Sequence, residues 1–178
     1  MKSARTYAFT LLVTLTFFAC SPEDNSSIPE EDTNEFTFNG ETYNLTSVII
    51  SDENTSSDEP STIGISIFNK TSSEITGNSD LEALTFVYFD LNAVNIQNTT
   101  YSDINDYNIS IDGTILDSEF SPGTVLLSDN DPDANVYAQS GTVTVTNFTE
   151  FNIVFSFTFT RNDGQVIFGS YDGNYLAP

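Results

Sequence analysis

The chain of 178 residues is strongly acidic, with 26 Asp and Glu against four Lys and Arg, and it contains no His, no Trp and a single Cys. This charge repels nucleic acids and anionic lipid headgroups, which argues against DNA or RNA binding. The missing residue types also exclude imidazole bases and the usual zinc ligand sets.

The N-terminus has the pattern of an export signal. Lys2 and Arg5 precede an apolar run from Tyr7 to Ala19, which is a positive n-region followed by an h-region of signal-peptide length. The run is shorter than the roughly 20 apolar residues of a permanent transmembrane helix. We therefore expect residues 1–19 to be a signal peptide that directs the rest of the chain across a membrane.

The single cysteine, Cys20, follows Ala19 at the end of this run. Its position resembles the lipobox of bacterial lipoproteins, in which the cysteine becomes the lipidated first residue of the mature chain. The resemblance implies membrane attachment through lipid on Cys20, and two or more acyl chains make such an anchor firm. The alternative is an ordinary signal peptide with an incidental cysteine, although no second cysteine exists to form a disulfide.

The residues after the cysteine carry the localisation that this resemblance implies. Ser21, in place of Asp, implies sorting to the outer membrane. The acidic stretch SPED is similar to the export signals of lipoproteins on the surface of Bacteroidetes-type bacteria. The chain is therefore expected at the outer membrane, exposed at the cell surface if the export signal acts.

Cleavage before Cys20 leaves Lys70 and Arg161 against all 26 acidic residues, a net charge of −24. Residues 20–34 contain the cysteine and a run of Ser, Pro and acidic residues, which is typical of a disordered tether. Residues 35–178 have the length of a single domain.

The apolar residues of this domain repeat with a period of two, which predicts β-strands. The first pair of strands flanks Asn39-Gly40, the dipeptide favoured by a type I′ hairpin turn. A turn at 80–83 and a short helix or irregular crossing at 91–97 are the remaining elements of this half. Further strands are predicted at 46–51, 63–67, 84–89, 107–111, 114–117, 123–127, 135–139 and 142–146.

The clearest strand spans 151–159 and places five large side chains on one face: Phe151, Ile153, Phe155, Phe157 and Phe159. A turn at 161–164 leads into a last strand at 165–171. The sequence therefore predicts an all-β fold, either an antiparallel β-sandwich or a lipocalin-like β-barrel of roughly 8–10 strands. The C-terminal segment resembles the closing meander of small lipoproteins of Bacteroidetes-type bacteria, many of which have no known function.

One loop has the spacing of calcium ligands. Asp129, Asp131 and Asp133 alternate, and Asn135 stands where a backbone carbonyl would complete the set. Ala134 and Ser140 replace the Gly and the bidentate Glu of an EF-hand, so two interpretations remain, a weak extracellular Ca²⁺ site and a solvated acidic turn. No other cofactor is expected.

The phenylalanine strand also allows two interpretations. Phe155, Phe157 and Phe159 could line an apolar ligand pocket, as in a carrier, or they could pack the core. Four tyrosines could stack on sugars if they are exposed, which keeps a glycan among the conceivable partners beside a protein: Tyr101, Tyr107, Tyr137 and Tyr175.

The residue types favour a non-enzymatic binding or structural module of the cell envelope. A lipocalin-like carrier of a small apolar ligand is the first alternative. A glycosidase that uses two carboxylates is the second, because Asp and Glu are the only abundant groups suited to acid–base chemistry.

Overall fold

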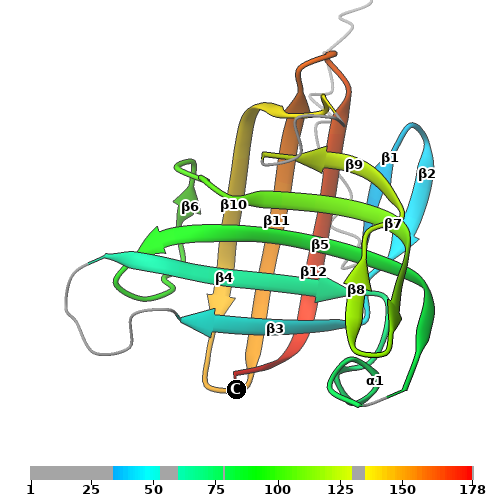
Figure 1. Ribbon diagram of the computed structural model, residues 1–178. Helices are drawn as coiled ribbons and strands as arrows, with labels where there is room; N and C mark the ends of the chain where they lie inside the picture. Colours follow the sequence, from blue (N-terminus) through cyan, green and yellow to red (C-terminus); the bar gives the residue numbers. More distant parts are fainter. Residues whose placement is uncertain (1–33, 53–59, 78, 130–134, 178) are drawn as a thin grey trace, which may run out of the picture. The chain divides into compact units, whose positions relative to one another are not determined.

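The computed structural model describes residues 34–52, 60–77, 79–129 and 135–177, which form twelve strands and one short helix, α1 (Ser72–Ile75) (Figure 1). The predicted all-β class is confirmed, with more strands than the expected 8–10. The strands are β1 (Glu35–Phe38), β2 (Glu41–Asn44), β3 (Ser47–Asp52), β4 (Ser61–Phe68), β5 (Leu81–Ala93), β6 (Thr100–Tyr101), β7 (Tyr107–Leu116), β8 (Glu119–Ser121), β9 (Thr124–Ser128), β10 (Ala138–Phe148), β11 (Asn152–Arg161) and β12 (Val166–Leu176).

The strands form one hydrogen-bonded sheet that folds into two facing layers. One layer has the order β2-β1-β12-β11-β10-β6, and the other contains β3-β4-β5-β7, with β8 and β9 both paired to β7. A short parallel pairing of β12 with β3 joins them, at Tyr175 opposite Val48 and Leu176 opposite Ile49. Figure 1 shows β3, β4, β5 and β7 crossing in front of β10, β11 and β12. The sheet is not closed into a barrel, so the barrel alternative is wrong and the two-layer alternative describes the fold.

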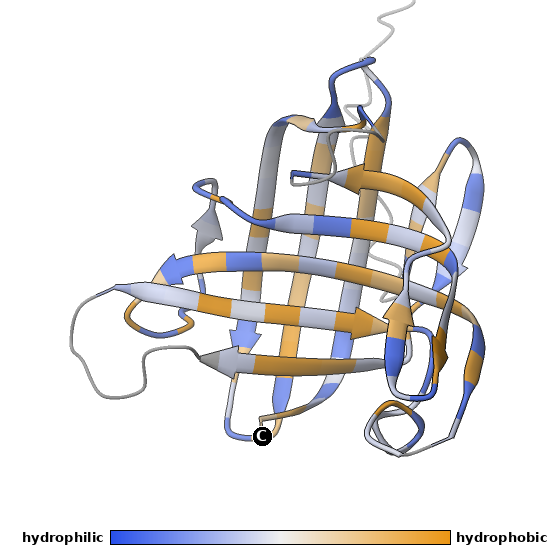
Figure 2. Ribbon diagram, viewed as in Figure 1, coloured by the Kyte–Doolittle hydropathy of each residue, from blue (hydrophilic) through white to orange (hydrophobic). Residues whose placement is uncertain are grey.

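The core between the layers is built from aromatic rings. Phe89 of β5 lies 5.7 Å from the ring of Phe155 and 5.8 Å from that of Phe157, both on β11. Its ring is also 6.4 Å from that of Phe159. All four side chains are at most 1% exposed. Figure 2 shows the alternation of apolar and polar residues along the crossing strands that produces this arrangement.

The turn chemistry places the first strands as the sequence predicts. Asn39 and Gly40 both have positive φ, 53° and 78°, as a type I′ hairpin requires. The hairpin of β1 and β2 attaches to the sheet through β1, which pairs with β12.

Several predicted boundaries are wrong. Phe151 is not part of the phenylalanine strand but lies in the turn before it, 68% exposed, because Thr149 and Asn152 bond to each other and close the turn around it. The stretch 91–93 continues β5, and the two strands predicted at 107–117 are one, β7, which passes through Asp112 with a φ of 56°. The strand predicted at 135–139 begins only at Ala138.

Removing a ring from the centre of this core tests its packing. We expect Phe157→Ala to lower the free energy of unfolding by about 3–5 kcal/mol, because the ring is fully buried between the layers. The neighbouring Thr158→Ala, at an exposed position of the same strand, should change it by less than about 0.5 kcal/mol. Urea unfolding measures both, and equal small losses would contradict a ring-packed core.

The buried phenol of Tyr171 makes stability depend on alkaline pH. Burial raises the pKa of Tyr171, and the carboxylate of Asp172 raises it further. Because the folded state holds the phenol proton more tightly than the unfolded state, this stabilisation is complete below about pH 10 and is lost as the pH rises above that value.

We therefore expect the free energy of unfolding to fall as the pH rises above about 10, and to fall less steeply in Tyr171→Phe. Tyr137→Phe is the control, because the side chain of Tyr137 is 51% exposed. Denaturant unfolding at each pH measures the slopes. Identical slopes in the parent protein and Tyr171→Phe would exclude this source of the pH dependence.

Candidate functional site

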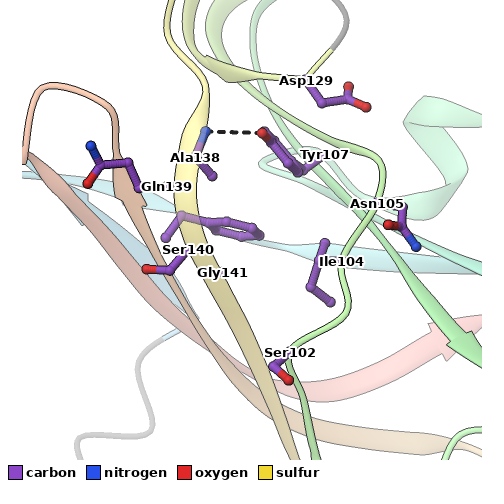
Figure 3. A pocket seen from close by; sticks show the side chains of 10 residues that line it. Ser102, Ile104, Asn105, Tyr107, Asp129, Ala138, Gln139, Ser140 and Gly141 are labelled. Atoms are coloured by element: carbon purple, nitrogen blue, oxygen red, sulfur yellow. Dashed lines mark hydrogen bonds between the residues drawn. The ribbon is translucent and has the colours of Figure 1, made fainter.

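A cleft of about 300 Å³ opens where β6 and β10 separate (Figure 3). The pairing of these strands covers only Tyr101 opposite Val143 and Thr100 opposite Thr144. Beyond Tyr101 the chain leaves β10 and forms a strand again only at β7, which leaves a gap beside the start of β10. We call this gap the Tyr107 cleft; its lining residues are Ser102, Ile104, Asn105, Tyr107, Asp129, Ala138, Gln139, Ser140, Gly141 and Phe159.

One wall of the cleft is the edge of β10. The N–H of Val145 donates to the carbonyl of Thr99 at 2.9 Å, so the backbone groups of Val145 point toward the β6 side. Because these groups alternate in direction along a strand, those of Val143 and Gly141 point the same way. The ladder with β6 stops at Val143, which directs the N–H and C=O of Gly141 toward the cleft.

A β-bulge shapes the same wall. Ala138 lies opposite Arg161 and Ser140 lies opposite Thr160, so Gln139 is the extra residue of β10. Bulges bend a strand and redirect its side chains. In Figure 3 the side chains of Gln139 and Ser140 extend on the other side of β10 from Ile104.

The base of the cleft is the ring of Phe159. A Cβ atom at Gly141 would come within 2.6 Å of Cε1 of this ring, so only glycine lets the ring lie against the backbone of β10. Phe159 itself is 0% exposed. The residue at 141 therefore fixes both the depth of the cleft and the position of its floor.

Tyr107 forms the far wall and ties it to β10. Its hydroxyl oxygen accepts a hydrogen bond from the N–H of Ala138 at 3.0 Å, shown as a dashed line in Figure 3. Its ring lies 5.6 Å from that of Phe159, and its carbonyl accepts from the N–H of Asp129 at 3.2 Å. The phenol thus closes one end of the gap, and the pairing of β6 with β10 closes the other.

The loop that carries Ser102, Ile104 and Asn105 is held by Asp90 of β5. One carboxylate oxygen of Asp90 accepts from the N–H groups of Asn105, at 3.0 Å, and Asp106, at 3.1 Å. The N–H of Asp90 donates in turn to the carbonyl of Asp106 at 3.0 Å. Asp90 is only 6% exposed, so this buried carboxylate positions the wall of the cleft without lining it.

The proposed calcium ligands are only partly within the described residues. Asp129 is exposed at the rim of the cleft, and the carbonyl of Asn135 accepts from Nδ2 of Asn162 at 3.1 Å. Asp131 and Asp133 lie outside the described residues, as does Cys20. Within the part of the chain that the structure describes, no group of three or more Asp, Glu, His or Cys is arranged to hold a metal ion. Calcium binding stays a prediction.

The three phenylalanines predicted as pocket residues have different positions. Phe155 and Phe157 are each 1% exposed and pack against Phe89 in the core. Phe159 lies at the boundary, in the core and at the floor of the cleft. The ring contacts favour the core interpretation for the first two.

Sequence reasoning named Tyr107 and Asp129 but did not join them. Ser102, Ile104 and Asn105 come from the polar stretch YSDINDYN at 101–108, whose density of Ser, Asp and Asn between two strands is the signal that identifies a functional loop. The start of β10, which forms the opposite wall, has no such signal in the sequence. Of the remaining tyrosines, Tyr101 bonds to Gln97, Tyr175 stacks on Phe148, and Tyr137 is exposed outside the cleft lining.

Comparison with known proteins gave no match to a family model, a curated protein or a solved structure. Among the described residues, no helix has both the length and the apolar character needed to cross a bilayer. The function is therefore argued from the chemistry of the Tyr107 cleft and of the sequence.

Loss of the Asp90 carboxylate should loosen the cleft wall. We expect Asp90→Ala to lower the free energy of unfolding by about 2–4 kcal/mol, because it leaves two N–H donors without their acceptor. Asp90→Asn keeps a carbonyl oxygen at this position and should cost less than half as much. Amide hydrogen exchange of Asn105 and Asp106 should accelerate in the alanine variant, and unchanged exchange would show that Asp90 does not hold the loop.

Proposed function

We propose that the chain is a lipid-anchored, non-enzymatic binding module of the cell envelope, attached through Cys20, and that the Tyr107 cleft is its ligand-binding site. The observation that carries the second part is the cleft itself, a gap of about 300 Å³ closed at both ends and floored by an aromatic ring. That volume is at the low end of the range for small-molecule sites. The ligand is accordingly small, and the Ser, Asn, Gln and Asp side chains of the lining favour a polar one.

The rigid surroundings support a binding role. Functional loops are most effective when a fixed scaffold positions them, and the 102–106 loop is fixed by Asp90 at one end and by β6 at the other. The bulge at Gln139 and the close contact of Gly141 with Phe159 shape the opposite wall. Little conformational freedom has to be lost when a ligand enters such a site.

The two alternatives from the sequence are less favoured. A carrier of an apolar ligand around Phe155 and Phe157 needs space that their contacts with Phe89 fill. A glycosidase needs two carboxyl groups within about 10 Å of each other across its cleft, and Asp129 is the one carboxylate among the described residues that line the Tyr107 cleft.

The anchoring part of the proposal is tested in cells that express the full chain. We expect Cys20→Ser to lose incorporation of labelled palmitate and to accumulate as the uncleaved precursor, because the acceptor thiol is absent. Ser21→Ala is the matched control and should be lipidated like the parent chain. A Cys20→Ser protein that is cleaved and remains in the outer membrane would refute the lipid anchor.

A further inference from the structure

We propose that the ligand of the Tyr107 cleft is a small organic ammonium ion on a short aliphatic chain, an inference that rests on the cleft being the binding site. Three observations carry it: the charge of the lining, the apolar surface inside it, and the backbone groups at its edge.

The charge around the cleft has one sign. Asp129 at the rim is the charged side chain among the lining residues, and the adjoining loop contains Asp103 and Asp106 as well. The field of a chain with 26 acidic residues and few basic ones concentrates cations at such a site and repels anions. A neutral ligand gains nothing from this field, whereas an ammonium ion gains in both affinity and association rate.

The nearest basic residue in the strand register does not cancel this charge. Arg161 lies opposite Ala138, but its guanidinium donates to the carbonyl of Leu126 at 2.9 Å and to the carboxylate of Asp163 at 2.8 Å. It also lies over the ring of Phe38, 5.1 Å from the ring centre. Its charge is therefore balanced by the carboxylate of Asp163, 2.8 Å away.

The interior of the cleft suits the aliphatic part of such a ligand. Ile104 supplies apolar side-chain surface to the cleft, and the ring of Tyr107 forms its far wall. An aromatic face within about 6 Å attracts an ammonium group through its quadrupole. The carbon chain of the ligand can thus lie against Ile104 while its charged end meets the ring of Tyr107 or the carboxylate of Asp129.

The edge of β10 supplies an acceptor. The carbonyl of Gly141 points toward the cleft, because the ladder with β6 ends before it. An ammonium group has three donors and no acceptor, so a carboxylate, a backbone carbonyl and an aromatic face form a complementary set. A second ammonium group, as in a diamine, would reach the Asp129 rim.

The test is calorimetric titration of the full lipidated chain in neutral detergent with the five-carbon diamine cadaverine. Two five-carbon ligands are matched to it. Pentane-1,5-diol has hydroxyls in place of the ammonium groups, and glutarate is a dianion with a carboxylate at each end. We expect one-to-one binding of the diamine that weakens severalfold at high salt, and no measurable binding of the other two.

Three variants separate the cleft from the acidic surface at large. Asp129→Asn should weaken diamine binding by about tenfold or more, since a charge-assisted hydrogen bond is lost. Asp112→Asn removes an equal charge from an exposed residue of β7, five residues and about 17 Å along the strand from Tyr107. Asparagine tolerates the positive φ of this position. Diamine binding should therefore stay within about twofold of the parent protein. Ser102→Trp should fill the cleft and abolish binding, whereas Ser121→Trp, exposed on β8, should not.

The outcomes distinguish this inference from the proposed function. Equal weakening by Asp129→Asn and Asp112→Asn, or no diamine binding, overturns the ammonium assignment. If pentanediol or glucose binds instead and Ser102→Trp abolishes that binding, the ligand is neutral and the cleft is still the site. If Ser102→Trp changes the binding of none of these ligands, the cleft is not the binding site, and the ammonium assignment fails with it.

Discussion

The contact of Phe89 with the phenylalanine row of β11 is the interaction on which the rest of the fold depends. Phe89 comes from one layer and Phe155, Phe157 and Phe159 come from the other, and their ring centres are 5.7–6.4 Å apart. Four fully buried rings exclude water from the space between crossing strands and contribute several kcal/mol each. Between the described strands of the two layers the only pairing is a two-residue parallel one, so side-chain packing, more than the hydrogen-bonded sheet, holds the layers face to face.

The same packing produces the cleft at its margin. Phe159 is the last ring of the row, and it lies directly against the backbone of β10 because position 141 is a glycine. Next to it Tyr107 of the other layer packs its ring against Phe159, 5.6 Å away, and accepts a hydrogen bond from the N–H of Ala138. The cleft is therefore a consequence of where the aromatic core ends. Its polar residues come from a loop that a buried carboxylate, Asp90, holds in place.

Much of the fold could be predicted from alternation and turn residues. The hairpin at Asn39-Gly40 and the phenylalanine strand follow from local rules, because a type I′ turn and a one-sided apolar strand each have few sequence solutions. The boundary at Phe151 could not be predicted, since the Thr149–Asn152 turn overrides a periodicity that would include it. The choice between a closed barrel and two open layers depends on which strand edges pair over long range, and among the described strands only β12 with β3 joins the layers. Alternation does not encode such pairing.

The candidate site was much less accessible to sequence reasoning. In the sequence Asp129 and Tyr107 each indicate a different chemistry, calcium binding and sugar stacking, because nothing there shows that residues 102–107 and 138–141 face each other. That proximity follows from the early end of β6 and from the bulge at Gln139. Asp90, the residue that fixes the loop, falls between the strand predicted at 84–89 and the crossing predicted at 91–97, so alternation assigns it no position, although it belongs to β5.

The most direct test of the account is an experimental structure of the full lipidated chain at high resolution. The account predicts continuous ring packing between Phe89 and the phenylalanine row, with no enclosed ligand there, and an open cleft between Tyr107 and Gly141. A lipid or an empty cavity among those rings would contradict it, because the functional site would then lie inside the core and the chain would be a carrier.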